Sequence, residues 1–130
     1  MDRDPTTTPG VPCFTVAGGV QVPGATELRD AQAAAHAADG AARVSGRAAI
    51  VSTNGLADAL RLASGLVTAF GDRSPVVAVV ELDDADADSA LPALTTASRT
   101  LIDLREGGSL DGIADALGTR APVAVVTAPG

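Results

Sequence analysis

The chain has 130 residues, enough for one domain with a single core, and 46% of them are hydrophobic. Its net charge of −7 argues against a nucleic-acid groove or an anionic membrane surface as partner. One cysteine, Cys13, excludes an internal disulfide, and no apolar run approaches the ~18 residues of a transmembrane helix. The first residues lack the basic and apolar regions of a signal peptide, so we expect a cytoplasmic protein.

The apolar side chains are mostly small. Phe14 and Phe70 are the only aromatic residues, and alanine and valine supply much of the remainder. Each small side chain removes little surface from water, at roughly 25 cal/mol per Å² of apolar area, so we expect a thin core. A partner surface would add to the buried area.

The N-terminal part predicts a tail followed by two strands. Residues 1–10 form a polar segment that we expect to be disordered, and the domain is expected to span residues 11–130. Pro12–Val16 predicts a strand that runs into a glycine turn at residues 17–19. A brief strand is predicted near Glu27–Arg29.

The central part predicts alternating helices and strands. Ala31–Val44 favours a helix, in which Gly40 suggests close packing against its backbone. The lone His36 is interpreted as a packed or hydrogen-bonded side chain and not as a ligand or base. Arg47–Ser52 predicts a buried strand, because its apolar residues run together. Leu56–Phe70 has apolar residues at helical spacing and predicts the next helix.

Pro75–Val80 predicts a second buried strand, and the acidic stretch Glu81–Pro92 follows it. Five acids in eight residues indicate a solvated loop, with a Mg²⁺ or Ca²⁺ site as the alternative. The calcium-loop pattern needs a central glycine and a terminal glutamate, and both are absent, which favours the loop.

The C-terminal part predicts strands at Arg99–Leu104 and Pro122–Thr127, with a helix at Ser109–Leu117 between them. Apolar strands alternating with helices indicate a single doubly wound α/β domain, with a mostly parallel sheet of about five or six strands and helices on both faces. Ligands of such sheets sit beyond the carboxyl ends of the strands. Any site is therefore expected at residues 17–19, at residues 52–55 and from Glu81 onward.

Local motifs at these turns are weak. Ser52–Gly55 opens a helix whose free N–H groups favour an anion, although an Asn-Gly pair in this place is more often a simple cap. No dinucleotide-binding or P-loop glycine motif occurs. Neither Ser52 nor Cys13 has the sequence context of a catalytic nucleophile.

The order of the segments carries more information. GVPCFTVAGG, AQAAAHAADGAARVSGRAAIVSTNG and TAFGDRSPVVAVV resemble the pyrimidine-binding (PYR) domain of thiamine diphosphate-dependent enzymes. The nearest groups are the stand-alone alpha subunits of sulfopyruvate and phosphonopyruvate decarboxylase type, or acetolactate synthase-like enzymes. The most specific part is the helix signature of Ala34, Ala35, Ala38, Asp39, Gly40, Ala42 and Arg43.

The resemblance implies thiamine diphosphate with Mg²⁺ as cofactor. In this family a separate PP domain holds the diphosphate and the metal, so no metal ligand is expected on this chain. The residues implied on the pyrimidine side are Ala17, Gly18, Gly19, Ala31, Ser52, Thr53, Asn54 and Gly55.

The resemblance also shows a missing acid. Family members use a glutamate to protonate N1′ of the aminopyrimidine, and Ala31 occupies that position here. Asp30 and Glu27 are nearby, but a shift of one residue turns a side chain to another face. The catalytic residue therefore remains unknown.

The Gly-Asp-Gly and Asn motif of PP domains does not occur either. The resemblance then predicts the PYR subunit of a split 2-oxo acid decarboxylase or carboligase, active as a hetero-oligomer with a PP-domain subunit on a small 2-oxo acid. One alternative is a degenerate, non-catalytic PYR-fold module that stabilises or regulates a partner. Another is a phosphate- or small-molecule-binding α/β protein unrelated to thiamine.

Overall fold

The computed structural model describes residues 12–16, 25–106 and 120–128. The predictions of a disordered tail at 1–10, a glycine turn formed by Ala17, Gly18 and Gly19, and a helix at 109–117 lie outside the described residues.

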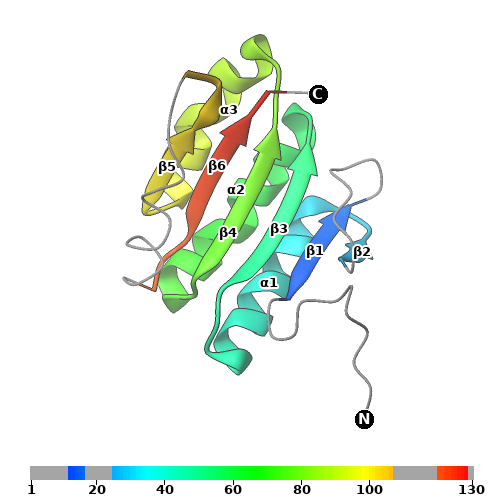
Figure 1. The fold of residues 1–130 in the computed structure, drawn as a ribbon, viewed down its shortest axis with the longest axis vertical. Coiled ribbons are helices and arrows are strands. Elements are labelled where there is room, and N and C mark those ends of the chain that lie inside the picture. Colours follow the sequence, from blue (N-terminus) through cyan, green and yellow to red (C-terminus); the bar gives the residue numbers. More distant parts are fainter. Residues whose placement is uncertain (1–11, 17–24, 107–119, 129–130) are drawn as a thin grey trace.

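Six parallel strands form one sheet, in the order β2-β1-β3-β4-β6-β5 (Figure 1). The strands are β1 (Cys13–Val16), β2 (Thr26–Leu28), β3 (Ala49–Asn54), β4 (Val76–Glu81), β5 (Thr100–Asp103) and β6 (Val123–Thr127). The central strands are almost continuous runs of alanine, valine and isoleucine, as strands buried on both faces require. The prediction of a single α/β domain with a parallel sheet is confirmed.

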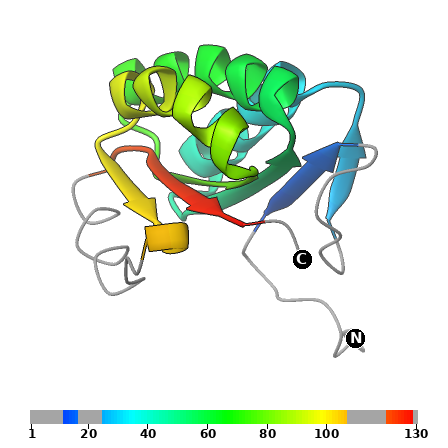
Figure 2. The ribbon, with the colours of Figure 1, turned by 90° about the horizontal axis from the view of Figure 1, so that it is seen from above.

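Three helices, α1 (Ala31–Ser45), α2 (Leu56–Asp72) and α3 (Asp84–Ala97), cover one face of this sheet (Figure 2). A short 3₁₀ helix, η1 (Leu104–Glu106), follows β5. The expected helices on the second face are not found among the described residues, and the helix predicted at 109–117 lies outside them. Within the described ranges, no helix combines the length and the apolarity needed to cross a membrane.

The main core lies between the helices and the sheet, and small residues dominate it. Fifteen of the 28 buried hydrophobic residues in the described part of the chain are alanine. A smaller cluster, Val77, Ile102, Val123 and Val125, packs on the opposite face. The expectation of a core built from small side chains is therefore confirmed.

The prediction of a loop over the acidic stretch is wrong, because most of this stretch is α3. Asp83 is the N-cap of this helix, and its Oδ1 accepts a hydrogen bond from the Asp86 N–H at 2.8 Å. Asp84 and Asp86 lie in the first turn, where the helix dipole favours negative charge. Among the described residues, no group of three or more His, Cys, Asp or Glu side chains could hold a metal ion.

Two expectations for α1 are also wrong. No described atom lies within 4 Å of a Cβ built on Gly40, so nothing packs closely against it. The close approach is at Gly65 of α2, where a Cβ would overlap the Cβ of Ala35. His36 is exposed and not packed, because it lies off the buried stripe of the helix.

Candidate functional site

The ends of the three central strands form a polar edge. Asn54, Glu81 and Thr127 close β3, β4 and β6 and lie side by side in register. Side chains alternate along a strand, so Glu81 and Thr127 share the face of Val79 and Val125, which is opposite the helices. The register thus places an amide, a carboxylate and a hydroxyl along one edge of the sheet.

Glu81 begins the third place at which the sequence predicts a site, although the stretch that starts with it is predicted to be a loop. It is half-buried, and its carbonyl oxygen accepts a hydrogen bond from the Gly55 N–H at 3.1 Å. The sequence feature that places Glu81 at this edge is its position at the end of a valine-rich strand. Its pairing with Asn54 follows only from the register of β3 and β4.

The predicted turn Ser52–Gly55 lies at this edge. Gly55 has φ 84° and ψ 157°, a backbone region that is essentially restricted to glycine. Apart from its chain neighbours, no described atom lies within 4 Å of a Cβ built on it, so the described residues leave space beside the turn. Gly55 occupies the N-cap position of α2, as the interpretation of Asn54-Gly55 as a helix cap expects, although no side-chain hydrogen bond caps this helix.

The residues before this turn are buried. The Thr15 hydroxyl donates to the carbonyl oxygen of Ser52 at 3.3 Å and ties β1 to β3. Thr53 is fully buried, and its Oγ1 has no hydrogen-bond partner among the described residues. An orphaned buried hydroxyl is uncommon in native proteins, and here it lies one residue from Asn54.

Ala31, the residue at the expected acid position, is the first residue of α1 and is fully buried in the main core. The neighbouring Asp30 is the N-cap, and its Oδ1 accepts a hydrogen bond from the Ala33 N–H at 2.8 Å. Glu27 is exposed on β2, an edge strand separated from β3 by β1. Neither acid takes the place of the missing glutamate, and Ala31 as a cofactor contact stays a prediction.

Cys13 is half-buried on β1. Burial raises the pKa of its thiol, because the thiolate is disfavoured away from water. The thiol is therefore protonated near neutral pH and is not an activated nucleophile.

Part of the helix signature has a structural role. Asp39 is buried and accepts hydrogen bonds from the Ser74 hydroxyl and from the Arg43 Nε, the latter at 3.3 Å. The same Arg43 Nε lies 3.6 Å from an oxygen of Asp72. These contacts join α1 to the segment that precedes β4, at the end of the sheet opposite the polar edge.

Residues 9–101, well over half of the chain, match the family model described as "Thiamine pyrophosphate enzyme, N-terminal TPP binding domain". The chain belongs to this family. It is also 56% identical over 52 residues to a "Probable acetolactate synthase large subunit" from Methanocaldococcus jannaschii. That alignment covers 39% of this thiamine pyrophosphate-binding domain and only 9% of the relative.

The described residues of this domain suit one side of the cofactor. A Cβ built on Gly55 would meet no described atom beyond its chain neighbours, and Asn54 and Glu81 place hydrogen-bonding groups at the same edge. Ala31 stands where the sequence resemblance predicts an acid. The described residues also lack a cluster of ligands for the Mg²⁺ that accompanies a diphosphate.

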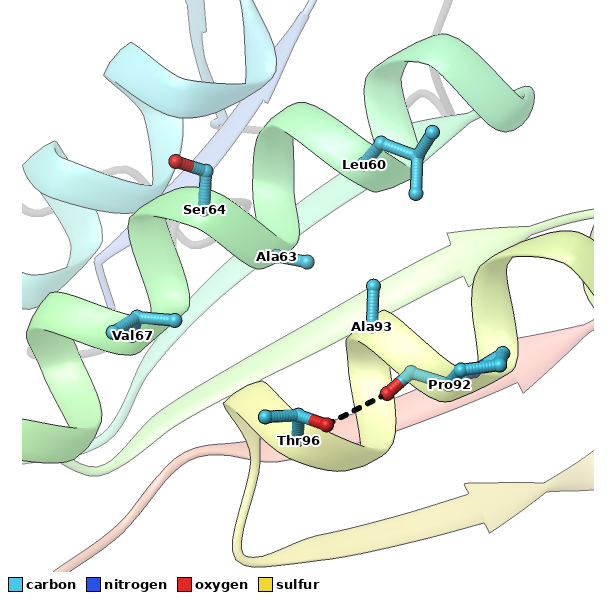
Figure 3. Close-up of a pocket in the computed structure, with 7 residues that line it drawn as sticks. All are labelled: Leu60, Ala63, Ser64, Val67, Pro92, Ala93 and Thr96. Atoms are coloured by element: carbon cyan, nitrogen blue, oxygen red, sulfur yellow. Dashed lines mark hydrogen bonds between the residues drawn. The ribbon is translucent and has the colours of Figure 1, made fainter.

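An apolar groove of 510 Å³ lies between α2 and α3 of the thiamine pyrophosphate-binding domain (Figure 3). The residues that line it are Leu60, Ala63, Ser64, Val67, Pro92, Ala93 and Thr96. Leu60 is 44% exposed and Val67 57% exposed. Its lining has no titratable side chain, so the groove is suited to packing and not to acid–base chemistry.

Proposed function

We propose that the chain supplies the pyrimidine-binding side of a thiamine diphosphate-dependent 2-oxo acid decarboxylase or carboligase. A PP-domain subunit would hold the diphosphate and Mg²⁺. The observation that carries this proposal is the placement of Ser52–Gly55 within the family match, at the polar edge and next to open space. The likeness to an acetolactate synthase subunit supports 2-oxo acids as the substrate class.

The cofactor, when bound, supplies a thiazolium ring that stabilises a carbanion formed from the 2-oxo acid. In this proposal, Gly55 allows the aminopyrimidine ring to approach the backbone of the turn. The amide of Asn54, half-buried beside it, has both a donor and an acceptor for the polar atoms of that ring. A ring stacked over this edge would also exclude water from the end of β3.

Two features support assembly with a partner. The main core consists largely of alanine, so the chain gains little burial from its own side chains. Leu60 and Val67 expose apolar surface on α2 that a partner surface would remove from water. Both features fit a chain that functions within a hetero-oligomer.

A second candidate is a non-catalytic module that stabilises or regulates a catalytic partner. It is favoured by the full burial of Ala31 and by the use of the Asp30 carboxylate as a helix cap. Both candidates require a partner. They differ in whether the assembled complex turns over a 2-oxo acid.

Calorimetry with thiamine diphosphate and Mg²⁺ tests the proposal. The chain alone is expected to show no micromolar, Mg²⁺-dependent binding, because its described residues include no group of acidic, histidine or cysteine side chains that could hold the metal bound to the diphosphate. With a PP-domain subunit from the same organism, Mg²⁺-dependent binding and turnover of a 2-oxo acid are expected. Micromolar, Mg²⁺-dependent binding by the chain alone contradicts the split arrangement. A stable complex without turnover supports the regulatory module.

A further inference from the structure

Three arginines converge at the end of the sheet opposite the polar edge. Arg73 follows α2, Arg99 precedes β5, and Arg120 precedes β6. Together with Phe70 and Ala121 they line a hollow of 340 Å³. The hollow lies at the amino ends of the strands, so it is distinct from the site proposed for the cofactor.

The charges of these arginines are not balanced within the described part of the chain. The ion pairs found there join Arg43, Arg61 and Arg105 to aspartates. None of them involves an arginine of the hollow. Because like charges repel and acidic residues outnumber basic ones in this chain, three arginines that line one hollow, with no acidic partner among the described residues, indicate a site for an anion.

The backbone supports this interpretation. Arg73 has φ 57° and Arg120 has φ 56°, and they are the two non-glycine residues with positive φ among the described residues. Glycine or asparagine is the usual residue in this left-handed region, and the Arg73 N–H closes α2 as a glycine would. The chain thus carries arginine at two positions where the backbone favours glycine. A need for the guanidinium group accounts for both.

We propose that this hollow binds a small polyphosphate anion, either free diphosphate or the diphosphate group of a nucleotide. Guanidinium groups hold phosphate oxygens in bidentate pairs, and three of them match the charge of a diphosphate. The volume of 340 Å³ lies at the lower end of small-molecule pockets, which is suited to a compact anion. The ring of Phe70, 38% exposed, borders the hollow and can stack on a nucleotide base.

The test is calorimetry with inorganic pyrophosphate on the 130-residue chain, without thiamine or Mg²⁺, so that failure of the proposed function does not affect it. Saturable binding with one site per chain is expected, and it should weaken as salt is added. Arg99→Gln is expected to lower the affinity by about tenfold or more. The matched control is Arg61→Gln, which removes an arginine paired with Asp58 outside the hollow and should leave the affinity unchanged.

Arg73→Gly and Arg120→Gly separate loss of the site from loss of the fold. Glycine accepts a positive φ without strain, so both variants should keep or raise the melting temperature while losing pyrophosphate affinity. Tighter binding of ADP than of pyrophosphate, reversed by Phe70→Ala, identifies a nucleotide as the ligand, whereas equal affinities identify free diphosphate. No saturable binding below the millimolar range, or an equal loss in Arg61→Gln, overturns the proposal.

Discussion

Both the backbone conformation and the proposed function require a glycine at position 55. Its φ of 84° and ψ of 157° exclude other residues by backbone strain, although the space for a Cβ is open. We expect Gly55→Ala to lower the free energy of unfolding by about 1–3 kcal/mol, measured by urea denaturation. Gly71→Ala, within α2 and equally free of contacts, is the control and should be neutral or stabilising by about 0.5–1 kcal/mol. Equal effects of the two changes would contradict the strain argument.

The same residue scale shows what the sequence could predict of the site. The turn Ser52–Gly55 was predicted because an Asn-Gly pair after an apolar strand is a local signal. Glu81 is predicted at the same edge because it ends an apolar strand, but its pairing with Asn54 depends on the register of β3 with β4, which no local pattern encodes. The prediction of a packed His36 is wrong. The spacing of Ala34, Ala35 and Ala38 defines the buried face of α1, and His36 lies outside that face.

At the scale of elements, the contact between α1 and α2 depends on one glycine. A Cβ on Gly65 would overlap the Cβ of Ala35 and lie 3.2 Å from the carbonyl oxygen of Gln32. Gly65→Ala is therefore expected to cost about 1–3 kcal/mol in urea denaturation, despite the better helix propensity of alanine. Gly71→Ala on the same helix is the control, and Ala35→Gly combined with Gly65→Ala should recover part of the loss. A neutral Gly65→Ala would show that the two helices can separate freely.

The elements also show which patterns can be read from sequence. The central strands were predicted within about two residues, because a parallel sheet buried on both faces requires continuous apolar runs. The high density of acids in residues 81–92 predicts a loop, but the positions of the acids favour a helix. Asp83 caps the start of α3, and Asp84 and Asp86 lie in its first turn, where the helix dipole stabilises negative charge. The sequence predicts close packing at Gly40, but the structure has it at Gly65. A glycine permits close packing only where its side of the helix faces the neighbouring helix, and the sequence does not show which helices are neighbours.

At the scale of the whole molecule, the sheet separates two charged environments. One end carries the polar row of Asn54, Glu81 and Thr127, and the other carries the arginine-lined hollow. An alanine-rich core joins them, so a ligand or partner at either end would stabilise a domain that gains little from its own side chains. Family membership identifies the cofactor class. The proposed activity requires a route to the reactive cofactor without an acid at Ala31.

Ala31→Glu tests that dependence directly. In the chain alone, a carboxylate at this fully buried position should lower the free energy of unfolding by a few kcal/mol, on the order of the cost of burying an unpaired polar group. Ala33→Glu is the control, because Ala33 is exposed in the same first turn, which has no acid and where negative charge contributes about 0.3–1 kcal/mol. Thermal melts of both variants measure this part of the prediction.

The second part uses the complex with a PP-domain subunit and thiamine diphosphate. A positioned acid contributes about 10²–10⁴-fold to proton transfer, so a catalytic site should exchange the thiazolium C2 proton at least about tenfold faster after Ala31→Glu. Exchange of this proton with deuterium is followed by NMR, and Ala33→Glu should leave the rate unchanged. Faster exchange supports the enzyme, because the new carboxylate then reaches the pyrimidine. Unchanged exchange together with a lower melting temperature supports the non-catalytic module, in which the carboxylate is only an unpaired charge in the core.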